Sequence, residues 1–234
     1  AFALYFLERI GQRAVLRFGL ENNADVTAKN PVLGAEQSRF ELVTPAGRAS
    51  IHLAFPGQHN VMNALAAGAM ALAAGASFDS VVAGLHNARP VAGRQAAMTL
   101  GNGAVLVDDS YNANPGSVSA AIATLALACA QDKKDAILVL GDMAELGAGA
   151  EALHAQLGSS AKAGGISQLL SCGRLSAAAS KAFGEGALHF NTREALVAFL
   201  NANLQSNQRI LVKGSRSSQM ELVVNALIQQ FGLK

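Results

Sequence analysis

The spacing of hydrophobic and polar residues changes character near residue 90. Before that point, short segments alternate apolar and polar residues, as half-buried strands do, at 14–19, 24–28, 38–44 and 48–55. The sequence TPAG at 44–47 is a hairpin signal, so the last two segments should pair antiparallel. Apolar stretches with helical spacing predict helices at 2–11, 60–74 and 78–87. We therefore expect a small β region followed by two helices.

After residue 95 the pattern alternates between strands and helices. Runs rich in Val, Leu and Ile predict strands at 103–109, 135–141, 167–172, 187–190 and 208–214. Helical spacing fills the intervals at 117–130, 150–163, 174–183, 192–203 and 217–230. This alternation is typical of βαβ units, and continuous apolar runs are typical of parallel strands buried on both faces. We predict the α/β fold class with a mainly parallel sheet, and a domain boundary near 89–93.

Composition narrows the functional classes. The chain of 234 residues is 51% hydrophobic and 15% charged, and its formal net charge of +2 is spread along the sequence. The absence of a basic block argues against nucleic acid as a partner. No signal peptide appears and no apolar run reaches the roughly 18 residues of a membrane span, so we expect a cytoplasmic protein with no membrane partner. Cys129 and Cys172 lie far apart without metal-ligand spacing, which predicts buried thiols and no metal site.

Polar loops follow three of the predicted strands. They have the sequences DDSYNANPGS at 108–117, GDMAELG at 141–147 and KGSRSS at 213–218. In open α/β sheets, ligands bind outside the carboxyl ends of the strands. Three polar loops at such ends therefore predict one site at one edge of the sheet.

The first loop offers two carboxylates. Asp108 and Asp109 are suited to ribose hydroxyls, or to Mg²⁺ through water. The alternative is local turn chemistry, in which Asn114 and Ser117 begin the following helix. Because a helix needs only one cap, Asp109 is the better functional candidate.

The other two loops have similar alternatives. Asp142 and Glu145 either face the site or cap a short helix. Lys213 and Arg216 lie beside a predicted helix N-terminus, where free N–H groups and the helix dipole favour an anion. The alternative for this pair is a solvated loop.

The first region has a polar cluster of its own, in the sequence GQHNVMN at 57–63. His59, Asn60 and Asn63 open a predicted helix, and the two asparagines lie three residues apart on one face. The alternative is an N-cap with a polar patch. Arg94, near the boundary, has a planar charge suited to phosphate. The other four histidines are expected to be surface or satisfied residues: His52, His86, His154 and His189.

Taken in order, the motifs are more specific than any one alone. The series GQHNVMNALAA, GR, DDSYNANPGS, LGDMAELG and LVKGSRS resembles the ATP-dependent Mur ligases of peptidoglycan synthesis, in particular those that add D-alanyl-D-alanine. The resemblance implies that residues 1–92 are the C-terminal part of a central ATP-binding domain. Residues 93–234 would be the Rossmann-like C-terminal ligase domain. It also implies a cytoplasmic monomer that uses ATP and Mg²⁺ to join UDP-MurNAc-tripeptide and D-Ala-D-Ala through an acyl phosphate.

The resemblance also assigns roles to residues. Asn63 would contact adenine, with His59 and Asn60 beside it. Arg94 and Asp109, the candidate catalytic residues, would bind the ribose and phosphates of ATP. Six further residues would complete the site, the first three in the nucleotide wall and the last three towards the peptide or acceptor: Tyr111, Asn112, Asn114, Lys213, Ser215 and Arg216.

One departure from the family is large. The sequence has no Gly-Lys dipeptide and hence no G-x-x-G-K-T phosphate loop, and it lacks the family's uridine-binding domain and Mg²⁺ carboxylate. We therefore expect a truncated chain that cannot catalyse alone and binds ATP weakly. Two alternatives remain open at this stage. One is a related Mur or folylpolyglutamate-type ligase, and the other is a non-catalytic nucleotide-binding module.

Overall fold

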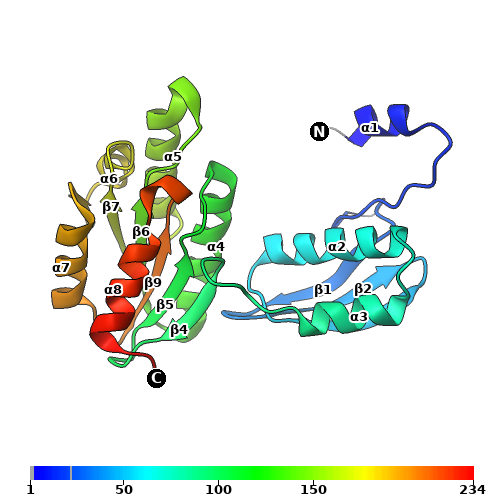
Figure 1. Cartoon of the computed structure of the whole chain (residues 1–234), viewed down its shortest axis with the longest axis horizontal. Coiled ribbons are helices and arrows are strands. Elements are labelled where there is room, and N and C mark those ends of the chain that lie inside the picture. Colours follow the sequence, from blue (N-terminus) through cyan, green and yellow to red (C-terminus); the bar gives the residue numbers. More distant parts are fainter. Residues whose placement is uncertain (1–2, 22) are drawn as a thin grey trace. The chain divides into compact units, whose positions relative to one another are not determined.

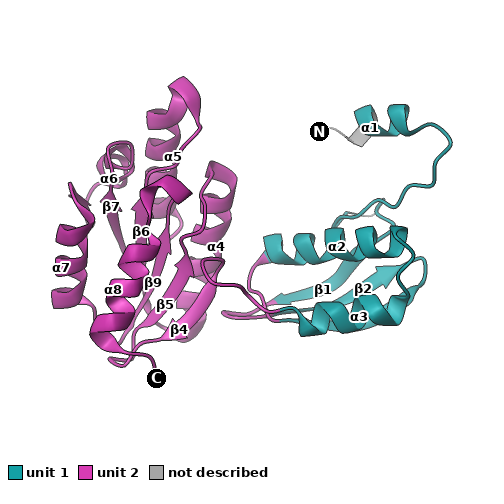
Figure 2. Ribbon diagram, in the orientation of Figure 1, with its two compact units in different colours: residues 1–32, 38–53, 58–88 teal, residues 33–37, 54–57, 89–234 magenta. Residues whose placement is uncertain are grey.

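The chain folds into two compact units, which Figure 2 shows in different colours. The computed structural model describes residues 3–234 except residue 22. The first unit contains the described residues up to 32 together with 38–53 and 58–88, and the second contains 33–37, 54–57 and 89–234. Each unit has its own sheet.

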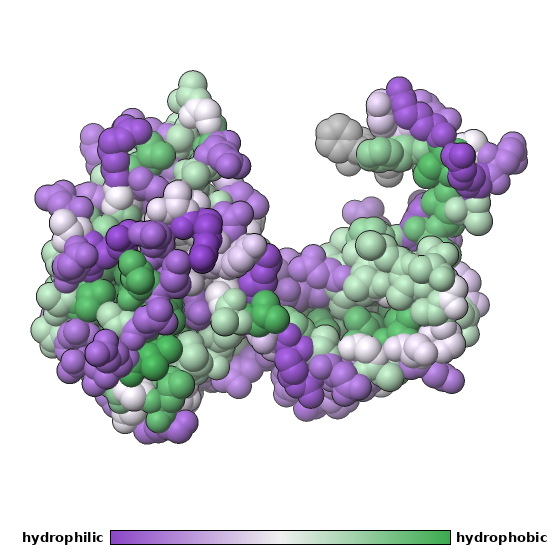
Figure 3. All heavy atoms as spheres, viewed as in Figure 1, coloured by the Kyte–Doolittle hydropathy of each residue, from purple (hydrophilic) through white to green (hydrophobic). Residues whose placement is uncertain are grey.

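The first unit is a three-stranded sheet covered by helices (Figure 1). Its elements are α1 (Ala3–Ile10), β1 (Thr27–Leu33), β2 (Ser38–Thr44), β3 (Gly47–Leu53), α2 (Gln58–Ala73) and α3 (Phe78–Asn87). The predicted hairpin is confirmed, because β2 and β3 pair antiparallel and Thr44 lies opposite Gly47. Alternate residues of these strands, such as Leu42 and Ile51, are fully buried. The surface over the Ala-rich α2 is pale green in Figure 3, in keeping with its small apolar side chains.

Two predictions for the first unit were wrong. Residues 14–19 form no strand; among the described residues, the only β-bridge of this segment joins Phe18 to Val26. The apolar side chains of Val15 and Phe18 are exposed, so alternation here does not mark a buried face. The strand predicted at 24–28 instead begins at Thr27 and continues to Leu33. The helix predicted from Phe2 does end before Gly11, although Phe2 itself lies outside the described residues.

The second unit is built on a six-stranded sheet with the order β4-β5-β9-β6-β7-β8. Every pairing from β5 to β8 is parallel, which confirms the predicted α/β class. The strands are β4 (Ala96–Thr99), β5 (Val105–Asp109), β6 (Asp135–Gly141), β7 (Gln168–Cys172), β8 (Ala187–Phe190) and β9 (Gln208–Lys213). The pattern missed β4, a four-residue edge strand that pairs antiparallel with β5.

Helices pack on both faces of this sheet (Figure 1). They are α4 (Pro115–Asp132), α5 (Ala150–Ala163), α6 (Ala177–Phe183), α7 (Arg193–Asn203) and α8 (Glu221–Phe231), with short 3-10 turns η1 (Gly147–Gly149) and η2 (Arg216–Ser218). Along β6, Leu138 and Leu140 belong to the core under α4, α5 and α6, whereas Ile137 and Val139 belong to the core under α7 and α8. Because both faces of this strand are buried, its sequence is a continuous run of apolar residues.

The cysteines are free and buried, as predicted. Burial raises the pKa of the Cys129 thiol to about 11, and it raises the pKa of Cys172 as well. Both thiols are therefore protonated and unreactive near neutral pH. No helix in the described part of the chain is long and apolar enough to cross a membrane.

Candidate active site

The three polar loops meet at one edge of the second sheet. Strands β5, β9 and β6 are neighbours and run parallel, so residues 109, 213 and 141 end at the same side. The backbone N–H of Ser215 donates to the carbonyl of Asp142 at 2.9 Å, and its hydroxyl donates to the same oxygen at 2.7 Å. The prediction of one shared edge is confirmed.

An ion pair joins two of the candidate residues. Lys213 Nζ lies 2.6 Å from Asp109 Oδ2, and the side chains are only 3% and 11% exposed. The same ammonium donates to the carbonyl of Asn112 at 3.0 Å. In the structure, Lys213 is the buried partner of the Asp109 carboxylate. The predicted contacts of Lys213 with the acceptor and of Asp109 with the nucleotide stay predictions.

Asp108, the neighbouring carboxylate, is used within the fold. One of its oxygens accepts the backbone N–H of Gly93 at 2.9 Å. The other accepts the N–H and the hydroxyl of Ser110, at 3.1 and 2.6 Å. Gly93 has a φ of +78°, and an added Cβ would lie 3.1 Å from the Cβ of Tyr111. Asp108 therefore fixes the segment before β4 against the end of β5.

This anchoring brings Arg94 over Tyr111. The guanidinium carbon of Arg94 lies 4.2 Å from the centre of the Tyr111 ring, which is cation–π geometry. Both side chains are exposed. A cation held on an aromatic ring at the sheet edge can meet an anionic ligand with little loss of side-chain entropy.

Asn114 and Ser117 form a helix cap, which was the alternative left open for this loop. The Asn114 side chain accepts the N–H of Ser117 at 2.8 Å, and the Ser117 hydroxyl accepts the N–H of Asn114 at 3.1 Å. Together they are a capping box at the start of α4, with Pro115 in the first turn. The amide oxygen of Asn112 accepts the next N–H, from Ala113, at 2.9 Å. These asparagines shape the loop, and their contact with nucleotide stays a prediction.

The 141–147 loop is held by residues that sequence reasoning did not connect. One Asp142 carboxylate oxygen accepts N–H groups from Leu175 and Ser176, at 3.0 and 2.7 Å, so it braces the loop after β7. His154 is fully buried. Its Nε2 accepts the N–H of Met143 at 2.9 Å, and its Nδ1 lies 2.7 Å from the carbonyl of Ala150. The expectation of a satisfied histidine is confirmed for His154.

One of the two alternatives for Asp142 and Glu145 does not hold, and one predicted helix start was wrong. Neither Asp142 nor Glu145 caps η1, which has no side-chain cap. The helix expected from residue 217 begins at Glu221, after a one-turn η2 and a left-handed Gln219. Arg216 pairs with Glu221 at 3.1 Å, and its side chain is 69% exposed. Its contact with an anionic ligand stays a prediction.

The polar cluster of the first unit lies at the start of α2. Asn63 Nδ2 donates to Asn60 Oδ1 at 3.4 Å, so the two asparagines share a helix face as predicted. His59 and Asn60 are half-buried, whereas Asn63 is exposed. The participation of these residues in a nucleotide site stays a prediction.

Comparison with known proteins decides the family. The protein-family model described as "Mur ligase, glutamate ligase domain" matches residues 93–216 of this chain. A second family model, described as "Mur ligase middle domain", matches residues 2–71. The chain belongs to the Mur ligase family. The resemblance inferred from the motifs is thereby confirmed. The middle domain precedes the ligase domain along the chain, as the motifs indicated.

Individual Mur ligases resemble the chain along nearly its whole length. It is 46% identical over 221 residues to the UDP-N-acetylmuramoyl-tripeptide–D-alanyl-D-alanine ligase of Escherichia coli K12, covering 93% of this chain and 48% of that protein. The ligase of the same name from Haemophilus influenzae is 38% identical over 88% of this chain and 45% of its own length. A crystal structure of MurF from Acinetobacter baumannii superposes with a TM-score of 0.86 at 31% identity, covering 97% of this chain and 50% of that one. The chain thus spans about half the length of the relatives it matches.

A Mur ligase with a different amino substrate matches less of the chain. The diaminopimelate-adding ligase of Bacillus velezensis is 40% identical over only 38% of this chain. Mur ligases are ATP-dependent and generally use Mg²⁺. In the described part of this Mur ligase, no group of three or more His, Cys, Asp or Glu side chains is arranged to hold a metal ion.

Proposed function

We propose that the full-length protein is an ATP-dependent amide ligase that joins D-alanyl-D-alanine to the carboxylate of a UDP-MurNAc-tripeptide. The observation that carries this proposal is 46% identity over 93% of the chain to a ligase of that name. The joined loops at the carboxyl edge of the second sheet support it, because they supply fixed charges where α/β sheets bind ligands. We place the reaction in the cytoplasm, with a monomeric enzyme and no nucleic-acid or membrane partner.

The reaction has two balanced steps. The substrate carboxylate takes the γ-phosphoryl group of ATP and releases ADP. The amine of the dipeptide then attacks the acyl carbon, and an amide, inorganic phosphate and a proton are formed. Catalysis of this kind depends on positioning the reactants and on stabilising phosphate charge.

In this scheme the residues of the second unit bind and orient the nucleotide. Arg94 contacts the ribose or phosphates, and the Tyr111 ring holds the guanidinium of Arg94 in place by a cation–π contact. Asp109 accepts from ribose hydroxyls, and Lys213 holds that carboxylate in one orientation. By resemblance to the family, we place most of the Mg²⁺ ligands in the part of the relatives that this chain does not cover.

The remaining residues take the outer parts of the site. Asn63 contacts adenine, with His59 and Asn60 shaping the start of its helix. Of the residues assigned to the acceptor, Arg216 is 69% exposed at its side chain and is therefore the one that can reach a substrate carboxylate. Ser215 is 3% exposed and bonded to Asp142, so it supports the loop.

Replacing Arg94 by alanine in the full-length enzyme tests this assignment. We expect kcat/KM for ATP to fall about 100-fold, the typical effect of losing one donor to a developing phosphate charge. Folding should be unaffected, because the side chain is exposed. The matched control is Arg39→Ala, which removes the same charge from an exposed position on β2 and should leave kcat/KM unchanged. An Arg94→Ala enzyme as active as the Arg39→Ala enzyme would remove Arg94 from the site.

A further inference from the structure

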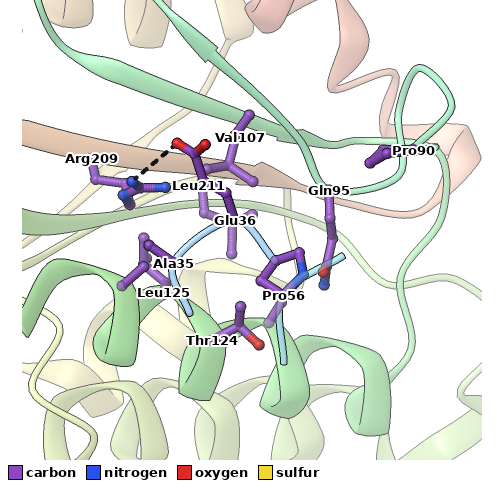
Figure 4. A pocket seen from close by; sticks show the side chains of 13 residues that line it. Ala35, Glu36, Pro56, Pro90, Gln95, Val107, Thr124, Leu125, Arg209 and Leu211 are labelled. Atoms are coloured by element: carbon purple, nitrogen blue, oxygen red, sulfur yellow. Dashed lines mark ion pairs between the residues drawn. The ribbon is translucent and has the colours of Figure 1, made fainter. Parts of the chain in front are cut away.

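A small pocket lies within the second unit, apart from the polar loops (Figure 4). It has a volume of about 170 Å³ and is bounded by β4, β5, β9, α4 and the segments 33–37 and 54–57. Its polar end is Arg209, four residues before Lys213 on β9. At about 3.3 Å per residue, the two side chains start roughly 13 Å apart along the strand. The pocket is therefore a feature separate from the proposed nucleotide site.

Most of the pocket wall is apolar. The apolar lining residues are Ala35, Pro56, Pro90, Ala97, Val107, Ala121, Leu125, Ala128 and Leu211. An apolar cavity of about 150 Å³ in another protein is known to hold benzene. The present pocket is therefore large enough for a molecule containing one six-membered ring.

One buried donor in the pocket lacks a partner. Arg209 is 2% exposed, and its Nε is a buried atom without a hydrogen-bond partner among the described residues. Another nitrogen of the same guanidinium, Nη2, donates to Asp132 and lies 3.9 Å from Glu36. Figure 4 draws the ion pair with Glu36. An unsatisfied buried donor costs free energy, so an acceptor that reaches Nε is favoured.

The charges around Arg209 select an uncharged acceptor. Asp132 and Glu36 already place two carboxylates against one guanidinium, so another anion would be repelled. The other polar lining groups are Gln95 and Thr124, and the Thr124 hydroxyl donates to the carbonyl of Ala120 at 2.9 Å. Gln95 has a φ of +56°, a conformation that costs free energy and that often occurs beside ligands. Its side chain extends along the pocket beside Pro56 (Figure 4).

We infer that this pocket binds a small uncharged molecule that has one ring and a single acceptor oxygen, with that oxygen on the Nε–H of Arg209. Ketones, phenols and amides of this size belong to the class. The ring lies against α4 and the face of β5 and β9. The pocket is separate from the ligation chemistry, so its occupancy does not depend on the proposed function.

Three probes of matched shape test the inference by titration of the 234-residue chain, followed by amide NMR shifts. Acetophenone has the ring and a neutral acceptor, ethylbenzene lacks the acceptor, and benzoate carries a charge. We expect acetophenone to produce saturable shifts at Ala97, Val107 and Leu125. Ethylbenzene should bind at least about tenfold more weakly, as expected for the loss of one hydrogen bond to a charged group, and benzoate more weakly still. Equal affinity for all three probes, or no saturable shift with acetophenone, would overturn the inference.

Variants then locate the binding. Ala128→Leu fills the pocket from α4 and should abolish acetophenone binding, whereas Ala123→Leu, at an exposed position of the same helix, should leave it intact. Arg209→Lys keeps a positive charge beside Asp132 but removes the Nε–H. It should lower the affinity for acetophenone to that for ethylbenzene and leave the affinity for ethylbenzene unchanged. Acetophenone binding that survives Ala128→Leu, or that is insensitive to Arg209→Lys, contradicts the assignment.

Discussion

Lys213→Met is expected to lower the free energy of unfolding by about 3 to 5 kcal/mol, the usual cost of removing one member of a buried ion pair. Lys213 is 3% exposed at its side chain and Asp109 is 11% exposed, so water cannot replace the lost ammonium. Methionine keeps most of the length and volume of lysine, so the loss reports the charge and its hydrogen bonds. The measurement is urea unfolding of the chain followed by circular dichroism.

Two further variants separate the buried pair from a general effect of charge. Adding Asp109→Asn to Lys213→Met removes the carboxylate charge that Lys213 neutralised and should restore part of the lost stability. Arg216→Met breaks an ion pair in the same loop, but the Arg216 side chain is 69% exposed, so the loss should stay below about 1 kcal/mol. A Lys213→Met loss no larger than that of Arg216→Met would show that the pair does not hold the loop.

Gly158→Ala is expected to lower the free energy of unfolding by about 2 to 3 kcal/mol, because it overfills the contact between α5 and α6. A Cβ at this position would overlap the carbonyl oxygen of Ala179 and lie 2.8 Å from its Cα. These are backbone atoms, which cannot turn away as a side chain can. The helices would have to separate, and the measurement is the same urea unfolding.

The control for this variant is Gly84→Ala in α3. Gly84 is also helical, but an added Cβ would have no neighbour within 4 Å. Alanine should therefore stabilise that helix by about 0.5 to 1 kcal/mol. If Gly158→Ala were neutral or stabilising, as Gly84→Ala should be, the close approach of α5 and α6 would be incorrect.

The parallel strands of the second unit could be predicted because a strand that is buried on both faces has a continuous run of apolar residues in its sequence. Residues 135–141 are apolar almost throughout, and they form β6 over the same range. By contrast, β4 is a half-exposed edge strand of four residues. Its sequence is too short to show the apolar pattern that predicts a strand. At residues 14–19 the pattern predicted a strand that the structure does not contain. Most side chains of this segment are exposed, and in the described part of the chain it pairs with no other strand.

The location of the site could be predicted, but its internal contacts could not. Strand ends in a parallel sheet meet at one edge, so the loops beginning at Asp108, Gly141 and Lys213 were expected to be neighbours. The pairing of Lys213 with Asp109 joins residues 104 positions apart, and no local pattern encodes it. The same holds for Asp142, whose carboxylate supports a loop 33 residues further along the chain.

Phosphate release by the full-length gene product tests the central claim most directly. The assay contains ATP, Mg²⁺, UDP-MurNAc-tripeptide and D-Ala-D-Ala, and each component is omitted in turn. We predict release only when all four are present, together with formation of the UDP-linked pentapeptide. Release that needs a single amino acid or a folate in place of the dipeptide, or no release under any combination, would contradict the proposed ligase activity.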